Sequence, residues 1–187
     1  MSAEVRPIVK IRPAVFPADR DIVSHLFLAY AQSLPIALDF QNFDHELANL
    51  PGKYDIQEHG GVWLAYTTPT SPPPQITSPT KIPSSTPEAS ADMAIGCVAL
   101  RSFPACSIPT CELKRLYIIP SARGMGVSKI LLEEVLNRAR ELAYKEMLLD
   151  TLSSMAAARK LYEGYGFREM EKYYESVEGA VFYRLVL

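Results

Sequence analysis

The stretch Arg123-Gly-Met-Gly-Val-Ser128 decides the fold, because it joins an apolar strand pattern to the most regular helical pattern in the chain. Before it, Glu112-Leu-Lys-Arg-Leu-Tyr-Ile-Ile119 has the composition of a strand, and Pro120 ends it. After it, apolar residues recur at three- and four-residue spacing from Gly124 to about Ala143, which predicts a long amphipathic helix. A glycine turn there exposes the unpaired N–H groups of the first helical turn, so the sequence predicts an anion site.

Strand and helix patterns continue on both sides of this stretch, in the order β-α-α-β-β-β-α-β-α-β-β. Two of the predicted strands, Val62–Thr67 and Met93–Leu100, could form a hairpin. The predicted helices occupy a stretch from Pro17 to Pro35, a short one before Pro51-Gly52, the long one above, and about Ser154 to Glu163. The other predicted strands are Ile8–Arg12, Val62–Thr67, Met93–Leu100, Met147–Leu152, about Phe167 to Tyr173, and Val181–Val186.

The segment 68–92 interrupts the predicted hairpin and differs in composition from its surroundings. It holds seven prolines, five serines and five threonines among 25 positions. So little apolar surface cannot offset the entropy lost on ordering, which indicates a mobile insertion. The 187 residues otherwise suit one domain spanning 1–187.

Charge and composition exclude several classes of function. Nineteen basic and 21 acidic side chains give a net charge of −2, which provides no general attraction for nucleic acid or an anionic membrane. The sequence shows neither a secretory pattern nor a long apolar span, so we expect a soluble, cytoplasmic protein. Cys97, Cys106 and Cys111 have no histidine nearby in sequence, which indicates reduced thiols and no metal site.

Three blocks in this order resemble the GNAT superfamily of N-acetyltransferases over about residues 93–187. They are Glu112 to Pro120, Ser121 to Ser128, and Met155-Ala-Ala-Ala-Arg-Lys-Leu-Tyr-Glu-Gly-Tyr-Gly-Phe167. The resemblance implies an α/β (α+β) fold with a mixed, mostly antiparallel central sheet of about six to seven strands, flanked by about four helices. It also implies an acyltransferase that uses acetyl-CoA as co-substrate and needs no metal.

By the same resemblance, the glycine turn holds the pyrophosphate of coenzyme A through backbone N–H groups from Met125 to Ser128. Ser128 stands where the family usually has glycine or alanine, and Met155 stands where many members have an asparagine that contacts the pantetheine arm. The cofactor-binding residues implied in this way are Leu116, Tyr117, Ile118, Arg123, Gly124, Met125, Gly126, Val127 and Ser128.

Acetyl transfer to an amine needs a proton acceptor for the amine and a proton donor for the thiolate. We expect Glu112 to be the acceptor, directly or through water, because alternation along a strand places it on the same face as Leu116 and Ile118. The resemblance implies that Tyr162 protonates the thiolate, with Tyr165 as a nearby competitor. The alternatives are a solvated or Lys114-paired acid for Glu112 and a core aromatic for Tyr162.

The acceptor amine is not identified by the sequence. We expect a small-molecule amine, with a protein or peptide amine as one alternative and a non-catalytic acyl-CoA-binding module as another. Aromatic residues Phe40, Phe43 and Tyr54 could wall an acceptor site, and acidic residues Asp39, Asp44 and Glu46 could attract its charge. Edge strands could pair two copies into a homodimer, which leaves the oligomeric state open.

Overall fold

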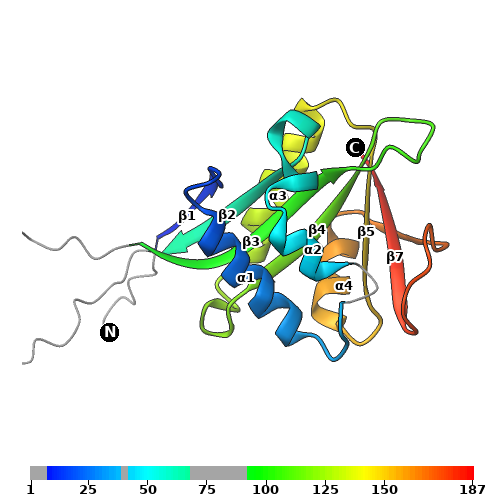
Figure 1. The fold of residues 1–187 in the computed structure, drawn as a ribbon. Coiled ribbons are helices and arrows are strands. Elements are labelled where there is room, and N and C mark those ends of the chain that lie inside the picture. Colours follow the sequence, from blue (N-terminus) through cyan, green and yellow to red (C-terminus); the bar gives the residue numbers. More distant parts are fainter. Residues whose placement is uncertain (1–7, 39–41, 68–91) are drawn as a thin grey trace, which may run out of the picture.

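The computed structural model describes residues 8–38, 42–67 and 92–187 (Figure 1). Its helices are α1 (Arg20–Ser33), α2 (Phe43–Ala48), α3 (Val127–Glu141) and α4 (Ala156–Gly164), with short 3-10 turns at Gly52–Tyr54, Ile56–Glu58 and Pro120–Ala122. Its strands are β1 (Val9–Pro13), β2 (Gly61–Thr67), β3 (Met93–Ser102), β4 (Thr110–Ile118), β5 (Glu146–Leu152), β6 (Arg168–Met170) and β7 (Ala180–Val186). The order of helices and strands predicted from the sequence is confirmed.

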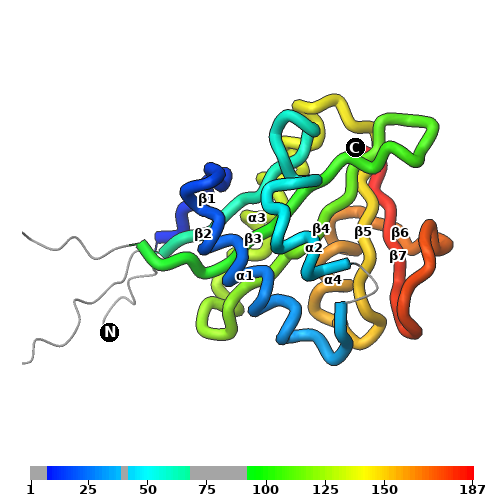
Figure 2. Tube along the Cα trace, in the orientation of Figure 1, coloured from blue at the N-terminus to red at the C-terminus, as the bar shows by residue number. Residues whose placement is uncertain are grey.

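The seven strands form a single sheet in the order β1-β2-β3-β4-β5-β7-β6. Figure 2 shows β1 at one edge and the two C-terminal strands at the other. Every neighbouring pair is antiparallel except β4 and β5. This confirms the predicted fold class, a mixed and mostly antiparallel sheet with helices against it.

The hairpin predicted around the segment 68–92 is present, since β2 pairs with β3 in antiparallel register. Residues 68–91 lie outside the described part of the chain. The insertion and the single-domain organisation therefore stay predictions.

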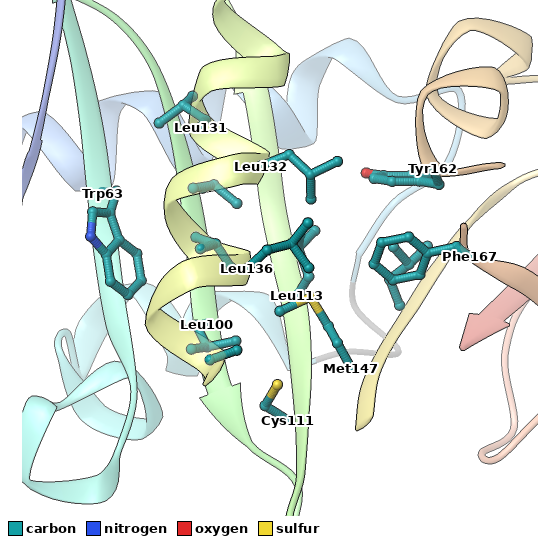
Figure 3. Packing of buried hydrophobic residues seen from close by; sticks show 14 of the residues in the cluster. Trp63, Leu100, Cys111, Leu113, Leu131, Leu132, Leu136, Met147, Tyr162 and Phe167 are labelled. Atoms are coloured by element: carbon teal, nitrogen blue, oxygen red, sulfur yellow. The ribbon is translucent and has the colours of Figure 1, made fainter. Parts of the chain in front are cut away.

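Two hydrophobic clusters cover the two faces of the sheet. One joins α3 to the sheet and also includes Tyr162 and Phe167; the other joins α1 and α2 to the opposite face. Figure 1 shows α1 and α2 crossing in front of the sheet, with α3 behind it. Figure 3 shows Leu132 and Leu136 of α3 facing Leu113 of β4 in the first cluster. Burial on both faces explains why β2 and most of β3 are apolar.

Gly96 of β3 allows β3 and β4 to approach closely. A Cβ built on it would lie 2.7 Å from the carbonyl oxygen of Tyr117 and 2.7 Å from Cδ1 of Ile118. A backbone carbonyl cannot swing aside as a flexible side chain can. A side chain at Gly96 is therefore incompatible with the present register.

We expect Gly96→Ala to lower the free energy of unfolding by about 1–3 kcal/mol, because the strands must separate to admit the methyl group. Urea denaturation of both proteins measures this difference. Gly164→Ala at the end of α4 is the matched control, since a Cβ there meets nothing within 4 Å. It should leave stability unchanged or raise it by up to about 1 kcal/mol. Equal losses in the two variants would contradict the argument.

Candidate functional site

A β-bulge in β4 determines which way its side chains point. Lys114 pairs with Ala99 and Tyr117 pairs with Cys97, so two residues of β4 face the single residue Val98. Arg115, inside the bulge, has a φ of 58°, in the left-handed region that residues other than glycine seldom occupy. The bulge shifts the alternation of β4 by one residue.

The expectation that Glu112 shares a face with Leu116 and Ile118 is wrong, because it assumed uninterrupted alternation. Leu113 packs in the cluster beneath α3, so Glu112 points to the opposite face. Beyond the bulge, Leu116 and Ile118 pack against the α3 cluster, and Tyr117 joins the cluster beneath α1 and α2. The extra residue in the bulge therefore puts Glu112 on the face of the sheet opposite to Leu116 and Ile118.

β4 and β5 pair only near their starts, through Thr110 with Glu146, Cys111 with Met147, and Glu112 with Leu148. Both strands then continue unpaired with each other, β4 to Ile118 and β5 to Leu152. A cavity of about 560 Å³ lies along this opening. Its walls come from both strands, α1, the turn before α3, and α4, through Tyr30, Ser33, Leu113, Lys114, Arg115, Leu116, Tyr117, Ile118, Arg123, Ser128, Asp150, Thr151, Ser154, Met155, Ala156, Ala157, Ala158, Leu161 and Tyr162.

The predicted anion site lies at the start of α3. Gly124 and Gly126 have φ angles of 81° and 80°, and the helix begins at Val127, three residues later than its apolar pattern suggested. Gly126 is its N-cap and provides no side-chain cap. Within the described residues, the N–H groups from Met125 to Ser128 have no protein acceptor. This turn can therefore bind an anion through its backbone.

The implied cofactor-binding residues fall into two groups. Arg123 and Ser128 line the cavity together with Leu116, Tyr117 and Ile118 of β4, and the Arg123 side chain donates from Nε to the Ile118 carbonyl at 3.2 Å. Gly124, Met125, Gly126 and Val127 are not lining residues of that cavity. The Val127 side chain is buried in the core, so this group offers its backbone.

Tyr162 enters the cavity from α4. The residue is 6% exposed, and its ring packs edge-on against Phe167, as Figure 3 shows, with 5.7 Å between ring centroids. The Tyr183 ring lies 6.4 Å away. Its hydroxyl has no protein partner within the described residues, and burial raises the pKa of Tyr162 well above its usual value. The competitor Tyr165 lies outside the cavity and donates to Glu133 at 2.5 Å. Tyr162 is thus a protonated hydroxyl facing the cavity.

Glu112 is fully buried and does not line the cavity. Its carboxylate binds the Arg101 guanidinium, accepts a hydrogen bond from the Tyr173 hydroxyl at 2.8 Å, and lies 3.3 Å from the Lys114 ammonium. Glu112 therefore belongs to a buried network of polar side chains and is not part of the cavity wall.

Asp150 is a cavity carboxylate that the sequence analysis missed. It lines the opening from β5, and its Oδ1 accepts from the Lys114 ammonium at 2.6 Å. Burial favours the neutral acid, but Lys114, together with Tyr174 and Arg115, outweighs it and lowers the pKa of Asp150. A charged residue within the mostly apolar run 147–152 was the available signal, because carboxylates are rarely buried without a partner or a function.

Several other candidates lie away from the cavity. Phe43 and Tyr54 are core residues of the α1–α2 cluster, Asp44 is exposed, and Asp39 and Phe40 fall outside the described residues. Cys97 and Cys111 are buried, and burial raises the pKa of each thiol to about 12, so both stay protonated at neutral pH. Nucleophilic chemistry at these thiols has no support here.

Glu46 of α2, expected as an acceptor-site acid, instead holds the bulge in place. Its two oxygens accept from Nε and Nη2 of Arg115 at 2.8 and 3.1 Å, and both side chains are at most 3% exposed. Lys53 and the Tyr54 hydroxyl bind the same carboxylate at 2.5 and 3.0 Å. Burial opposes the charge of Glu46, but Arg115 and Lys53 outweigh it and lower the pKa of Glu46.

Residues 8–38, 42–67 and 92–187 contain neither a candidate metal site nor a candidate membrane-spanning helix. No three side chains of the metal-binding types lie close enough together there to hold an ion. None of the helices in these ranges has the length and apolar content needed to cross a bilayer.

Comparisons with family models and with known proteins both find acetyltransferases. The sequence model of the Acetyltransferase (GNAT) family matches residues 86–167. An uncharacterised N-acetyltransferase of Schizosaccharomyces pombe is 33% identical over 180 residues, covering 95% of this chain and 94% of that protein.

Two solved structures share the fold. An acetyltransferase from Salmonella typhimurium with its cofactor acetyl-CoA has a TM-score of 0.64 at 18% identity, covering 95% of this chain and 93% of the other. A chain of the NatC complex, bound to Gag peptide and CoA, has a TM-score of 0.60 at 21% identity, covering 96% and 98%. At these identities the structural likeness concerns the fold alone.

We expect Glu46→Gln to lower the free energy of unfolding by about 3–5 kcal/mol, because it leaves the buried Arg115 without its counter-ion. Urea denaturation at neutral pH measures the loss. Glu141→Gln is the control, since it breaks an exposed pair with Arg138 on α3 and should change stability by less than about 1 kcal/mol. Similar effects of the two substitutions would contradict the role of Glu46.

The pH dependence of stability provides a second readout. The lowered pKa of Glu46 means that its contribution is complete above the unfolded carboxyl pKa of about 4.3 and is lost as the pH falls through the lower folded value. Glu46→Gln should therefore reduce the loss of stability on acidification below that pH.

Proposed function

Because the chain belongs to the acetyltransferase (GNAT) family, we propose that it transfers the acetyl group of acetyl-CoA directly to a primary amine of a small molecule. The homologues named N-acetyltransferases and the family match establish it as an acetyl-CoA-dependent acyltransferase. The acceptor class and the roles of individual residues are our proposal. They are supported mainly by one cavity that brings together the α3 turn, the unpaired edge of β4, Tyr162 and Asp150.

The α3 turn suits the pyrophosphate of coenzyme A. Its N–H groups from Met125 to Ser128 can each donate to a phosphate oxygen, and Arg123 can add a charged contact. From that turn, the cavity runs along Leu116, Tyr117 and Ile118, where unpaired backbone can bind the amides of the pantetheine arm. Met155 offers a thioether in place of an amide, so we propose a mainly apolar contact there.

The chemistry that we propose is direct transfer without an acyl-enzyme. The lone pair of the neutral amine attacks the thioester carbon, a C–N bond forms, and the C–S bond breaks. The nitrogen loses one proton and the sulfur gains one, which yields an N-acetyl amine and the free thiol. A main-chain N–H at Leu116 or Ile118 stabilises the developing oxyanion, and the Tyr162 hydroxyl protonates the sulfur.

Asp150 is better placed than Glu112 to accept the proton of the attacking amine, because Asp150 lines the cavity and Glu112 does not. We assign Glu112 a positioning role, since it fixes Lys114, which in turn binds Asp150. The positive charge of Lys114 beside the carboxylate disfavours a protonated amine there. This effect of Lys114 increases the share of the neutral, nucleophilic amine.

Isothermal titration with acetyl-CoA and with desulfo-CoA, followed by a screen for thiol release, tests this function. We expect both compounds to bind with similar affinity, because the pyrophosphate and pantetheine contacts do not involve the sulfur. Thiol release should follow with small primary amines. Release only with peptides carrying a lysine or a free N-terminus would replace the acceptor class, and binding without release for every amine would indicate a non-catalytic module.

We expect Tyr162→Phe to lower kcat by about 100-fold or more with an unchanged Kd for acetyl-CoA, because the ring packing stays and only the proton donor is lost. Steady-state kinetics and titration measure the two effects. Tyr165→Phe is the matched control, since that hydroxyl binds Glu133 outside the cavity. An unchanged kcat for Tyr162→Phe would remove this residue from the mechanism.

The pH profile gives an independent check on Tyr162. Burial raises its pKa, so the acid form persists as the pH rises through the ordinary tyrosine pKa of about 10. Loss of the Tyr162 proton should therefore not lower the kcat of the wild-type enzyme between about pH 8 and 9.5. A fall of kcat in this range that is absent from Tyr162→Phe would contradict the raised pKa.

A further inference from the structure

The segment 171–179 connects β6 to β7 and places two adjacent tyrosines against the buried network around Glu112 and Asp150. The Tyr173 hydroxyl donates to Oε1 of Glu112 at 2.8 Å. The Tyr174 hydroxyl bonds to the carboxylate of Asp150. Neither tyrosine is a lining residue of the main cavity, whereas Asp150 is. The segment therefore reaches a cavity residue from outside the cavity.

The Tyr174 hydroxyl has two partners of opposite charge. It accepts from Nζ of Lys114 at 3.3 Å, and it donates to Asp150, because an ionised carboxylate can only accept. Lys114 also donates directly to Oδ1 of Asp150 at 2.6 Å. The three side chains thus form a closed triangle of hydrogen bonds. In this triangle the hydroxyl proton has one direction, toward Asp150.

Aromatic packing fixes the ring that carries this hydroxyl. The centroid of the Tyr174 ring lies 5.0 Å from that of Tyr173 and 5.2 Å from that of Phe182, both edge-on. The Lys114 ammonium lies 5.4 Å from the same centroid. A phenylalanine would keep all of these ring contacts. The packing therefore does not require the hydroxyl.

Lys114 alone leaves Asp150 free to turn. The three protons of its ammonium face three acceptors, namely Asp150 at 2.6 Å and both Tyr174 and Glu112 at 3.3 Å. Its bond to Asp150 is at Oδ1, and a carboxylate held at one oxygen can still rotate about its terminal torsion, which is broad for aspartate. A second donor on the same carboxylate restricts this rotation.

We propose that Tyr174 is a positioning residue, whose hydroxyl holds the Asp150 carboxylate in the orientation in which it accepts the proton of the attacking amine. This rests on the proposed acetyl transfer and adds to it a residue outside the cavity. The amine nitrogen loses one proton to Asp150, and Tyr174 keeps its own. Burial, with Asp150 nearby, raises the pKa of Tyr174, which keeps the hydroxyl protonated.

Tyr174→Phe tests the proposal in the full chain, because it removes the hydroxyl and retains the ring. We expect kcat/KM for ethylamine at saturating acetyl-CoA to fall by about tenfold or more, since a misdirected carboxylate accepts the proton less often. The Kd for acetyl-CoA should stay unchanged. Tyr144→Phe is the matched control, because its hydroxyl donates to the His59 carbonyl at 3.1 Å, away from the cavity. It should alter neither constant.

A second amine separates positioning from general damage to the fold. The compound 2,2,2-trifluoroethylamine has the skeleton of ethylamine, but its fluorines withdraw electrons and leave the nitrogen mostly neutral at neutral pH. After attack it loses its proton readily to water, so it depends less on Asp150. Tyr174→Phe should therefore lower kcat/KM for this amine by less than about threefold, and Asp150→Asn should show the same difference between the two amines.

The hydrogen-bonded triangle can be tested without any substrate. Lysine-labelled protein gives an NMR signal for the ammonium of Lys114, whose protons should exchange slowly with water because each faces an acceptor. Tyr174→Phe should speed this exchange severalfold, and Tyr144→Phe should leave it unchanged.

The outcomes separate this inference from the proposed function. An equal fall of kcat/KM for the two amines, or no fall, would overturn the positioning role and leave acetyl transfer standing. Unchanged exchange of the Lys114 protons in Tyr174→Phe would overturn the triangle on which that role depends. No thiol release by the wild-type protein with any primary amine would overturn the function and the inference together.

Discussion

The ion pair between Glu46 and Arg115 is the interaction on which the site depends. It joins α2 to the one residue of β4 whose backbone is left-handed, at 2.8 and 3.1 Å, with both side chains buried. Such a backbone conformation persists only where its surroundings hold it. The rings of Tyr30 and Phe43 lie 5.7 and 5.2 Å from the guanidinium and enclose it further. The bulge, and through it the direction of every later residue of β4, is held by contacts from the first two helices.

The charged side chains near the cavity are also held by ion pairs with one another. Arg101, Glu112, Lys114 and Asp150 alternate in sign along a buried chain that ends at the cavity wall. Removing one member leaves its neighbour in the network with one partner fewer, which is costly where that neighbour is buried. A network of this kind contributes little to net stability, but it holds the Asp150 carboxylate ionised in one place. For a site that handles amines, a fixed carboxylate is more useful than a mobile one.

The sequence was sufficient for the fold but not for the side-chain geometry of the site. Element order followed from apolar periodicity, and the α3 turn followed from Gly124 and Gly126, whose left-handed φ angles the structure shows. The bulge at Arg115 could not be anticipated, because arginine has no local preference for that conformation and the residue that stabilises it, Glu46, is 69 positions away. Tyr162 was found because it falls within a family block. Asp150 was missed although it lies in a predicted strand, because its significance depends on where β5 separates from β4.

The short seam between β4 and β5 also affects how the molecule can open. Among the described residues, the backbone ladder between the two strands has three residue pairs and the Lys114–Asp150 ion pair adds one side-chain contact, and this seam divides the sheet into a four-stranded part and a three-stranded part. Amide hydrogen exchange should therefore show the two parts as separate cooperative units, with partial opening along the seam below the energy of global unfolding. A molecule bound between the two strands touches both parts of the sheet. Its binding therefore lowers the population of the opened form. Substrate binding would then stabilise the sheet of this enzyme as well as start its reaction.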